Sequence, residues 1–236
     1  MNQSVYLALD FPSWEETKQF LQTNQLNGVP VKVGMELFYR EGPKVIENLR
    51  ENNHSIFLDL KLHDIPTTVM KAMRSISKLD VEMVNVHALG GAEMIKRAKE
   101  GLTTGHPNKT KLIAVTILTS MDKQTMNNEL LLPGEVDDKV SHFAHFSQSN
   151  GVDGVVCSVY EAEKIKVECG DNFLTVTPGI RLGGTEVNDQ KRIATPAYAK
   201  SQGTDYIVVG RSITNAENPK KAYERVVEEW TNGSIV

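Results

Sequence analysis

The sequence has few of the features that mark secreted or membrane proteins. It contains 2 cysteines in 236 residues, too few for a disulfide framework, and Cys157 lies in an apolar run that predicts a buried small hydrophobe. No stretch approaches the roughly 18 continuous apolar residues that a membrane-spanning helix needs. The first residues lack the basic region and the apolar core of a signal peptide. We therefore expect a cytoplasmic protein without a membrane partner.

Neither sign of charge is in large excess. Lys and Arg number 26 and Asp and Glu number 30, which gives a net charge of −4. This balance argues against a general nucleic-acid binder, although a local basic pocket could still bind a small anion. The apolar fraction of 40 % is ordinary for a globular chain and excludes disordered and fibrous classes.

Short apolar runs rich in β-branched residues recur along the whole chain. Many are continuously apolar, as is typical of strands buried on both faces of a parallel sheet, and the intervening segments can hold crossover helices. We therefore predict one α/β domain over residues 1–236, a (β/α)8 TIM barrel, with an open doubly wound sheet as the alternative. The predicted strands are 5–10, 29–34, 55–61, 83–88, 111–118, 154–158, 174–180 and 206–211.

The connections between these strands also carry signals. Asn218 before Pro219 predicts the start of a helix, because it places a capping side chain ahead of a proline at the first helical position. The connections over residues 119–133 and 179–192 are longer than a barrel requires. The second contains three glycines, so we expect a flexible lid over a ligand, with a tolerated surface insertion as the alternative.

The densest group of charged residues follows the third predicted strand. Residues two apart on a strand share a face, so Asp59 and Lys61 are expected to point into the barrel mouth while Leu58 and Leu60 face the outer helices. Asp64 follows in the loop and can turn back toward them. Buried charges must be paired, and flanking carboxylates favour the ammonium form of Lys61, which suits a proton donor. A structural salt bridge at a strand end is the alternative.

Two further charged residues lie at the ends of the neighbouring strands. Lys32 stands at an inward position between Val31 and Val33, and Asp10 ends the first apolar run. Catalytic groups of barrels collect at the carboxyl ends of the strands. The coincidence of these residues with Asp59 and Lys61 therefore predicts one shared site.

A phosphate site is predicted at the other side of the barrel mouth. Gly210 and Arg211 end the last predicted strand, and the loops after strands seven and eight of barrels frequently bind phosphate. Glycine lets an anion approach the backbone, and arginine can bind it with two hydrogen bonds. Arg181 supplies a second guanidinium after the seventh strand. The 6 histidines have no metal-ligand spacing, and His87 is expected to be a hydrogen-bonded structural residue.

Taken together, these residues resemble the orotidine 5′-phosphate decarboxylase family over nearly the whole chain. The most specific match is the Asp-x-Lys-x-x-Asp-Ile-Pro stretch over residues 59–66 combined with Lys32. The resemblance implies a homodimeric (β/α)8 barrel that uses no metal and no organic cofactor and converts orotidine 5′-phosphate to uridine 5′-phosphate. Further matches lie at residues 7–10, 32–34, 67–68, 84–87, 118–120, 177–181 and 209–213.

The same resemblance implies a role for each matching residue. Lys61 is the proton donor to C6 of the pyrimidine, within a charged network formed with Lys32, Asp59 and, from the partner subunit, Asp64. The implied substrate contacts are Asp10, Lys32 and the partner's Thr68 at the ribose, Thr119 or its neighbour Ser120 at the pyrimidine, and Arg181, Gln190, Gly210 and Arg211 at the phosphate.

Two other functions remain open from the sequence. A sugar-phosphate decarboxylase or aldolase-type synthase of the wider barrel group would share Asp-x-Lys-x-x-Asp but needs magnesium. Such an enzyme is expected to have an acidic ligand where Lys32 stands, and lysine cannot replace it. A non-catalytic phosphate-binding protein is the second alternative, but it would need no paired charges beside its pocket.

Overall fold

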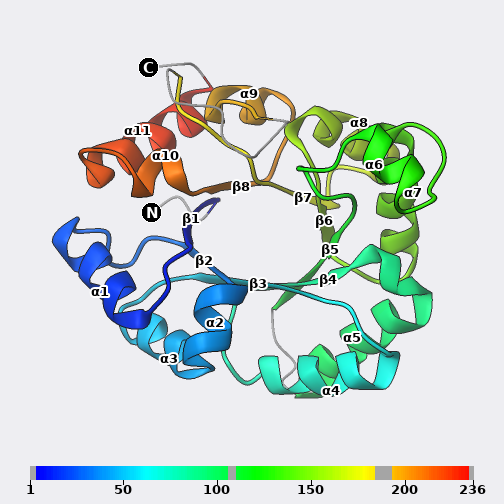
Figure 1. The fold of residues 1–236 in the computed structure, drawn as a ribbon, viewed down its shortest axis with the longest axis horizontal. Helices are drawn as coiled ribbons and strands as arrows, with labels where there is room; N and C mark the ends of the chain where they lie inside the picture. Colours follow the sequence, from blue (N-terminus) through cyan, green and yellow to red (C-terminus); the bar gives the residue numbers. More distant parts are fainter. Residues whose placement is uncertain (1–3, 106–109, 184–192, 234–236) are drawn as a thin grey trace.

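The computed structural model describes residues 4–105, 110–183 and 193–233, in which eight parallel strands close into a barrel inside a ring of helices (Figure 1). The predicted (β/α)8 barrel is confirmed. The open sheet is excluded because β8 pairs with β1, with Val5 opposite Ile207. The strands are β1 Val5–Leu9, β2 Val31–Gly34, β3 Ile56–Leu62, β4 Met83–His87, β5 Lys111–Val115, β6 Gly154–Val156, β7 Leu174–Thr177 and β8 Tyr206–Val209.

The helices pack on the outside of the barrel and follow the strands in sequence (Figure 1). None of the helices in the described ranges is long and apolar enough to cross a membrane. Their bounds are α1 Trp14–Thr23, α2 Met35–Glu41, α3 Lys44–Glu51, α4 Pro66–Ile76, α5 Gly91–Gly105, α6 Lys123–Asn128, α7 Val136–Ser149, α8 Val159–Cys169, α9 Pro196–Ser201, α10 Arg211–Thr214 and α11 Pro219–Asn232, with a 3₁₀ turn, η1, at Ala88–Gly90.

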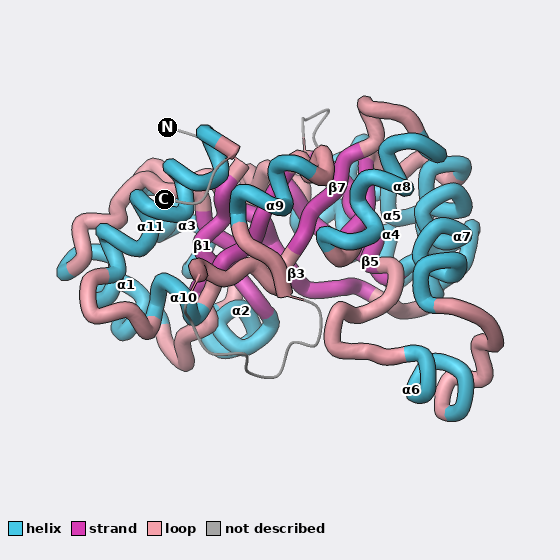
Figure 2. The backbone as a smooth tube through the Cα atoms, turned by 90° about the horizontal axis from the view of Figure 1, so that it is seen from above, coloured by secondary structure: helices cyan, strands magenta, loops and turns pink. Residues whose placement is uncertain are grey.

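Two helix starts show why the chain turns where it does. The side chain of Asn218 accepts the N–H of Lys221 at the start of α11, as the sequence predicts. The long connection over residues 119–133 holds α6, which the sequence analysis did not predict and which begins because Asp122 accepts the N–H of Thr125. Figure 2 shows α6 standing away from the barrel. Of the predicted lid, residues 184–192 lie outside the described residues.

Several strands end earlier than predicted. The run over 111–118 leaves the sheet after Val115, and those over 174–180 and 206–211 leave after Thr177 and Val209. Some of the apolar residues beyond these points, Ile117 and Leu118 among them, line a cavity instead of pairing with the next strand. The predicted strands are too long because apolar composition indicates burial, and residues remain buried after the hydrogen-bonded pairing of the strands has ended.

The barrel has an outer and an inner apolar core. The outer core lies between strands and helices and contains Leu58 and Leu60. The inner core fills the lumen, where the rings of Tyr6 and Phe57 meet edge-on at 6.0 Å. Its upper residues, Phe57 among them, form the apolar floor of the cavity at the carboxyl ends of the strands.

Acidic side chains hold the opposite end of the barrel together. Each one precedes an even-numbered strand, accepts a backbone N–H of the strand before it, and pairs with a basic side chain of a helix. These stabilising contacts therefore lie at the amino ends of the strands, apart from the charged side chains at the carboxyl ends. The sets are Glu82 with Ile56 and Arg50, Asp153 with Leu112 and Lys99, and Asp205 with Thr175 and Lys166.

Candidate active site

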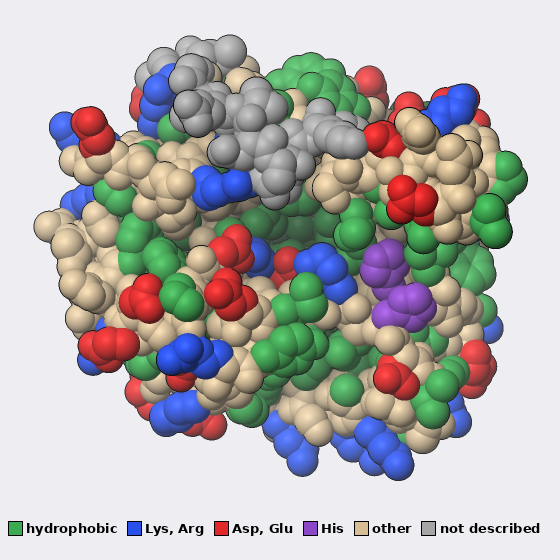
Figure 3. Space-filling view, in the orientation of Figure 1, with side chains coloured by type: hydrophobic (Ala, Val, Ile, Leu, Met, Phe, Trp, Pro, Cys, Tyr) green, Lys and Arg blue, Asp and Glu red, His purple; other side chains and the backbone are tan. Residues whose placement is uncertain are grey.

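A cavity of about 670 Å³ opens at the carboxyl ends of the strands. Figure 3 shows it as a hollow at the centre of one face, with acidic and basic side chains inside it. Most of the predicted site residues line this cavity, namely Asp10, Lys32, Asp59, Lys61, Thr119, Arg181, Gly210 and Arg211. The structure therefore brings together residues from the ends of six of the eight strands and the loops that follow them.

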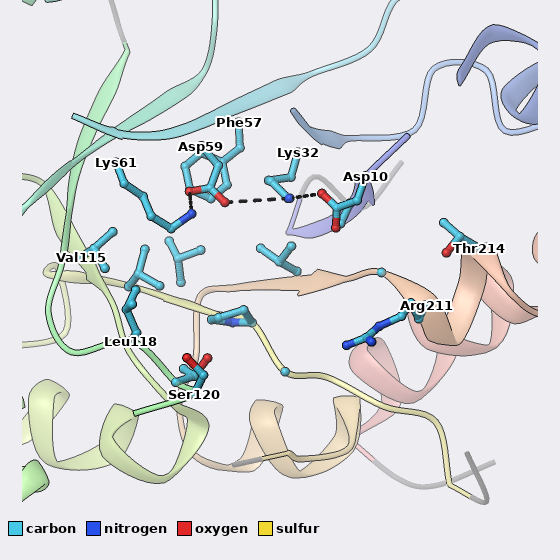
Figure 4. A pocket seen from close by; sticks show the side chains of 18 of the residues that line it. Asp10, Lys32, Phe57, Asp59, Lys61, Val115, Leu118, Ser120, Arg211 and Thr214 are labelled. Atoms are coloured by element: carbon cyan, nitrogen blue, oxygen red, sulfur yellow. Dashed lines mark hydrogen bonds and ion pairs between the residues drawn. The ribbon is translucent and has the colours of Figure 1, made fainter. Parts of the chain in front are cut away.

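A row of alternating charges crosses one side of the cavity. Lys61 Nζ lies 2.7 Å from Asp59 Oδ1, the second oxygen of Asp59 lies 3.9 Å from Lys32 Nζ, and Lys32 Nζ lies 2.6 Å from Asp10 Oδ1. Figure 4 shows the row running along the ends of β3, β2 and β1. Each charge except the two at the ends lies between two of opposite sign.

Burial increases toward the middle of this row. The side chains of Lys32 and Asp59 are 10 % and 16 % exposed, whereas those of Lys61 and Asp10 are 29 % and 63 % exposed. Desolvation of a charge is costly, and the opposite charges on both sides offset that cost for the two inner residues. The free face of the Lys61 ammonium is turned toward the cavity (Figure 4).

Strand β3 places this lysine through an irregularity. The pairing of β3 with β4 shifts in register between Leu58 and Leu62, and Lys61 adopts a left-handed backbone with φ of +52°. The predicted alternation holds, because Leu58 and Leu60 are buried on the outer side while Asp59 and Lys61 reach the cavity. Left-handed backbone is costly outside glycine and concentrates at functional sites.

Asn85, for which the sequence predicted no separate role, joins this cluster from β4. Its amide nitrogen donates to Asp59 Oδ1 at 2.7 Å, and its amide oxygen accepts the N–H of Lys61 at 2.7 Å. The signal was available, since Asn85 is a polar residue at the inward position between Met83 and His87 on an apolar strand.

Two histidines lie beside Lys61. The ring of His87 stacks on that of His63 with centroids 5.5 Å apart. His87 Nδ1 is buried with no hydrogen-bond partner in the described residues, so this atom does not make the structural hydrogen bond expected of His87. Burial, and then the charges of His63 and Lys61, lower the pKa of His87. Within the described ranges no three His, Cys, Asp or Glu side chains are arranged to hold a metal ion.

The opposite side of the cavity carries the predicted phosphate site. Arg211 follows Gly210 at the start of α10, and Figure 4 shows its guanidinium across the cavity from Lys61. Arg181 is 7 % exposed, and its guanidinium donates to the carbonyl of Ile180 at 2.9 Å. Two guanidinium groups and a glycine backbone can thus meet an anion at this end.

Two of the predicted residues do not line the cavity in the single chain, and a third lies outside the described residues. Asp64 and Thr68 are exposed and do not line it, and Asp64 Oδ1 accepts the N–H of Ile65 at 2.6 Å. Gln190 lies outside the described residues. The first two sit on the loop after β3 and on the first turn of α4, next to the strand that carries Lys61.

Known proteins resemble the chain along its whole length. Residues 3–226 match the family model described as "Orotidine 5′-phosphate decarboxylase / HUMPS family". The orotidine 5′-phosphate decarboxylases of Bacillus cytotoxicus and Bacillus cereus AH187 are 53 % and 52 % identical to it, over 100 % of each chain. The crystal structure of the Lactobacillus acidophilus orotidine 5′-phosphate decarboxylase matches with a TM-score of 0.85 and 42 % identity, covering 97 % of this chain and 99 % of that one. A structure of an uncharacterized conserved protein from Geobacillus kaustophilus matches equally well, with a TM-score of 0.85 and 43 % identity over 96 % of this chain and 99 % of that one.

Proposed function

The chain belongs to the orotidine 5′-phosphate decarboxylase / HUMPS family, and from this membership we propose how its cavity removes carbon dioxide from orotidine 5′-phosphate. The reaction yields uridine 5′-phosphate in pyrimidine nucleotide synthesis. It needs a group that stabilises negative charge at C6 of the pyrimidine and then protonates that carbon. The proposal assigns both tasks to Lys61, which lines the cavity with its ammonium held by Asp59.

The chemical step begins with the bond between C6 and the carboxylate. When this bond breaks, its electron pair remains on C6 in an sp² orbital, and the carboxylate leaves as carbon dioxide. The Lys61 ammonium stabilises that charge because it is fixed in place before the charge develops. It then transfers a proton to C6, and the resulting amine regains a proton from water.

Asp59 keeps Lys61 in place and acts on the substrate through its charge. Its Oδ1 holds the ammonium, while its Oδ2 faces Lys32. A carboxylate at this position also lies near the substrate carboxylate and raises the energy of the bound ground state. Asp10 and Lys32, joined at 2.6 Å, face the ribose hydroxyl groups in this assignment.

The remaining contacts fix the two ends of the nucleotide. Thr119 is 8 % exposed at the cavity wall and is assigned to the pyrimidine, with Ser120 beside it as the alternative contact. Gly210, Arg211 and Arg181 are assigned to the phosphate, together with Gln190. Binding energy from the phosphate contributes to rate because it holds the distant C6 against Lys61.

The observation that carries this proposal is the lysine at position 32 inside the charged row. A magnesium-dependent sugar-phosphate enzyme would need a carboxylate there, whereas Lys32 is already paired with Asp10 and faces Asp59. We expect purified protein to convert orotidine 5′-phosphate to uridine 5′-phosphate at the same rate before and after exhaustive treatment with EDTA. Loss of activity that magnesium restores would favour the sugar-phosphate alternative.

We further propose that the working enzyme is a homodimer with composite sites. Asp64 and Thr68 are exposed on the face that carries the cavity, and they flank Ile65, which is 67 % exposed. Leu89, in the next βα loop, is 38 % exposed. Exposed apolar side chains next to polar side chains that do not reach the cavity of their own chain suit an interface between two copies. In such a dimer, each copy donates Asp64 and Thr68 to the cavity of the other.

Mixing two inactive variants tests the composite site. In a hybrid of Lys61→Ala and Asp64→Ala subunits, one site carries both lesions and the other carries neither. With random exchange, half of the dimers are hybrids with one intact site of two, so about a quarter of wild-type activity is expected to return. The measurement is the rate of uridine 5′-phosphate formation after mixing, with exchange followed by native mass spectrometry.

A matched mixture provides the control. Lys61→Ala mixed with Asp59→Ala is expected to recover nothing, because both residues serve the site of their own subunit. Absence of recovery in the first mixture, despite complete exchange, would place Asp64 in the site of its own chain.

A further inference from the structure

The buried side-chain amide of Asn85 forms hydrogen bonds with both Asp59 and Lys61, two neighbouring members of the charged row. It stands on β4 with no exposed surface and does not line the cavity, so it does not touch a ligand there. Its two hydrogen bonds reach different parts of β3. One goes to the carboxylate of Asp59, and the other comes from the backbone of Lys61.

The hydrogen bond with Lys61 provides an acceptor for a backbone N–H that regular strand pairing leaves without one. The register shift of β3 against β4 and the φ of +52° at Lys61 take this N–H out of the regular ladder. A buried N–H without an acceptor is strongly unfavourable. The side-chain oxygen of Asn85 accepts it at 2.7 Å and thus supports the left-handed conformation that aims the Lys61 side chain into the cavity.

The bond to Asp59 fixes the rotation of the carboxylate. Asp59 Oδ1 receives two donors, the ammonium of Lys61 and the amide nitrogen of Asn85, each at 2.7 Å. Oδ2 is left facing Lys32 at 3.9 Å. Asn85 therefore determines which oxygen faces which lysine.

Only an amide of this length does both tasks. The backbone N–H of Lys61 needs a hydrogen-bond acceptor, and the carboxylate of Asp59 needs a donor. These two partners therefore determine the orientation of the Asn85 amide. An aspartate in its place would accept from Lys61 but, when ionised, would repel Asp59. A leucine would fill similar space and serve neither partner.

We propose that Asn85 is a positioning residue for the decarboxylation, which fixes the ammonium of Lys61 and the carboxylate of Asp59 relative to each other. This inference rests on the proposed function of the cavity. Because Asn85 acts on the groups at C6 and lies away from Arg211, its loss is expected to lower kcat and to leave the binding of the phosphorylated ligand nearly unchanged.

The test compares Asn85→Asp and Asn85→Leu with wild type. We expect both variants to lower kcat about 10- to 100-fold, as expected when a reacting group loses its alignment, with KM and the Kd of uridine 5′-phosphate within about threefold of wild type. Thr116→Val is the matched control. Thr116 is buried and donates to a strand carbonyl at 2.8 Å but touches neither Lys61 nor Asp59, so its kcat is expected to stay at the wild-type value.

The pH profile supplies a readout that a merely structural role would not move. At low pH the introduced carboxyl of Asn85→Asp shares a proton with Asp59 and donates as the amide does, so the ratio of its kcat to that of wild type is expected to rise from about pH 8 to about pH 5.5. The Asn85→Leu ratio is expected to stay flat. The charged and titratable groups that face position 85, Lys61 and Asp59 on β3, Lys32 on β2, His87 on β4 and its stacking partner His63, are present in every protein compared. Asn85→Leu adds no charge among them, so a rise confined to Asn85→Asp reports the introduced carboxyl.

Two results would overturn the inference. Wild-type kcat in both folded variants would overturn it. A parallel loss of kcat, ligand affinity and melting temperature, with both pH ratios flat, would overturn it too and make Asn85 a purely structural residue. Failure of the proposed function is distinguishable from either, because wild type would then form no uridine 5′-phosphate in the same assay.

Discussion

Replacing Lys61 with alanine is expected to abolish turnover of orotidine 5′-phosphate while the barrel stays folded. General acid catalysis alone contributes about 10²–10⁴-fold to rate, and the fixed positive charge at C6 adds to this. The fold is expected to tolerate the change. Asp59 keeps the amide of Asn85 and faces Lys32, and the cavity admits water to solvate it. The measurements are kcat at saturating substrate and thermal unfolding of the same samples.

Two companion variants separate charge from proton transfer. Lys61→Arg keeps a positive charge but does not release its proton at neutral pH, so we expect a similarly low kcat. Lys164→Ala, which removes an exposed lysine paired with Asp138 on the helical surface, is expected to leave kcat unchanged. More than about a tenth of wild-type kcat in Lys61→Ala would remove this lysine from the role of donor.

Replacing Arg211 with alanine is expected to weaken the use of orotidine 5′-phosphate far more than that of a substrate without the phosphate. A charge-assisted hydrogen bond contributes about 1.5–3 kcal/mol, so kcat/KM for the nucleotide should fall roughly 10- to 100-fold or more. Orotidine has no group to meet Arg211, and its low reactivity should barely change. The measurement is kcat/KM for both substrates in wild type and variant.

Arg211→Lys serves as the matched variant for this prediction. It retains the charge but loses the planar pair of donors, so we expect an intermediate loss for the nucleotide. Equal losses for the two substrates in Arg211→Ala would assign Arg211 to the barrel or to the chemistry and remove it from the phosphate site.

The fold was predictable because a parallel barrel buries its strands on both faces. Every expected strand was found, and the inward positions of Lys32, Asp59 and Lys61 followed from alternation along the strands. The strand ends were placed too far along, since residues such as Leu118 remain apolar after they leave the ladder.

The parts of the site that escaped prediction depend on backbone detail. The left-handed conformation of Lys61 arises from a register shift between β3 and β4, and no composition or period of one strand encodes a shift against its neighbour. Alternation along the strand marks Asn85 as an inward polar residue, but its role was hidden for the same reason, because its partner is a backbone N–H that regular strand pairing would have satisfied.

The exchange of hydrogen at C6 of uridine 5′-phosphate tests the central claim most directly. If the Lys61 ammonium protonates C6, its amine form must remove that proton in the reverse direction, and deuterium from D₂O then enters C6. Proton NMR of saturated enzyme in D₂O follows the H6 signal. We predict that wild type loses this signal and that folded Lys61→Ala retains it over the same time; loss at the same rate in both proteins would contradict the account.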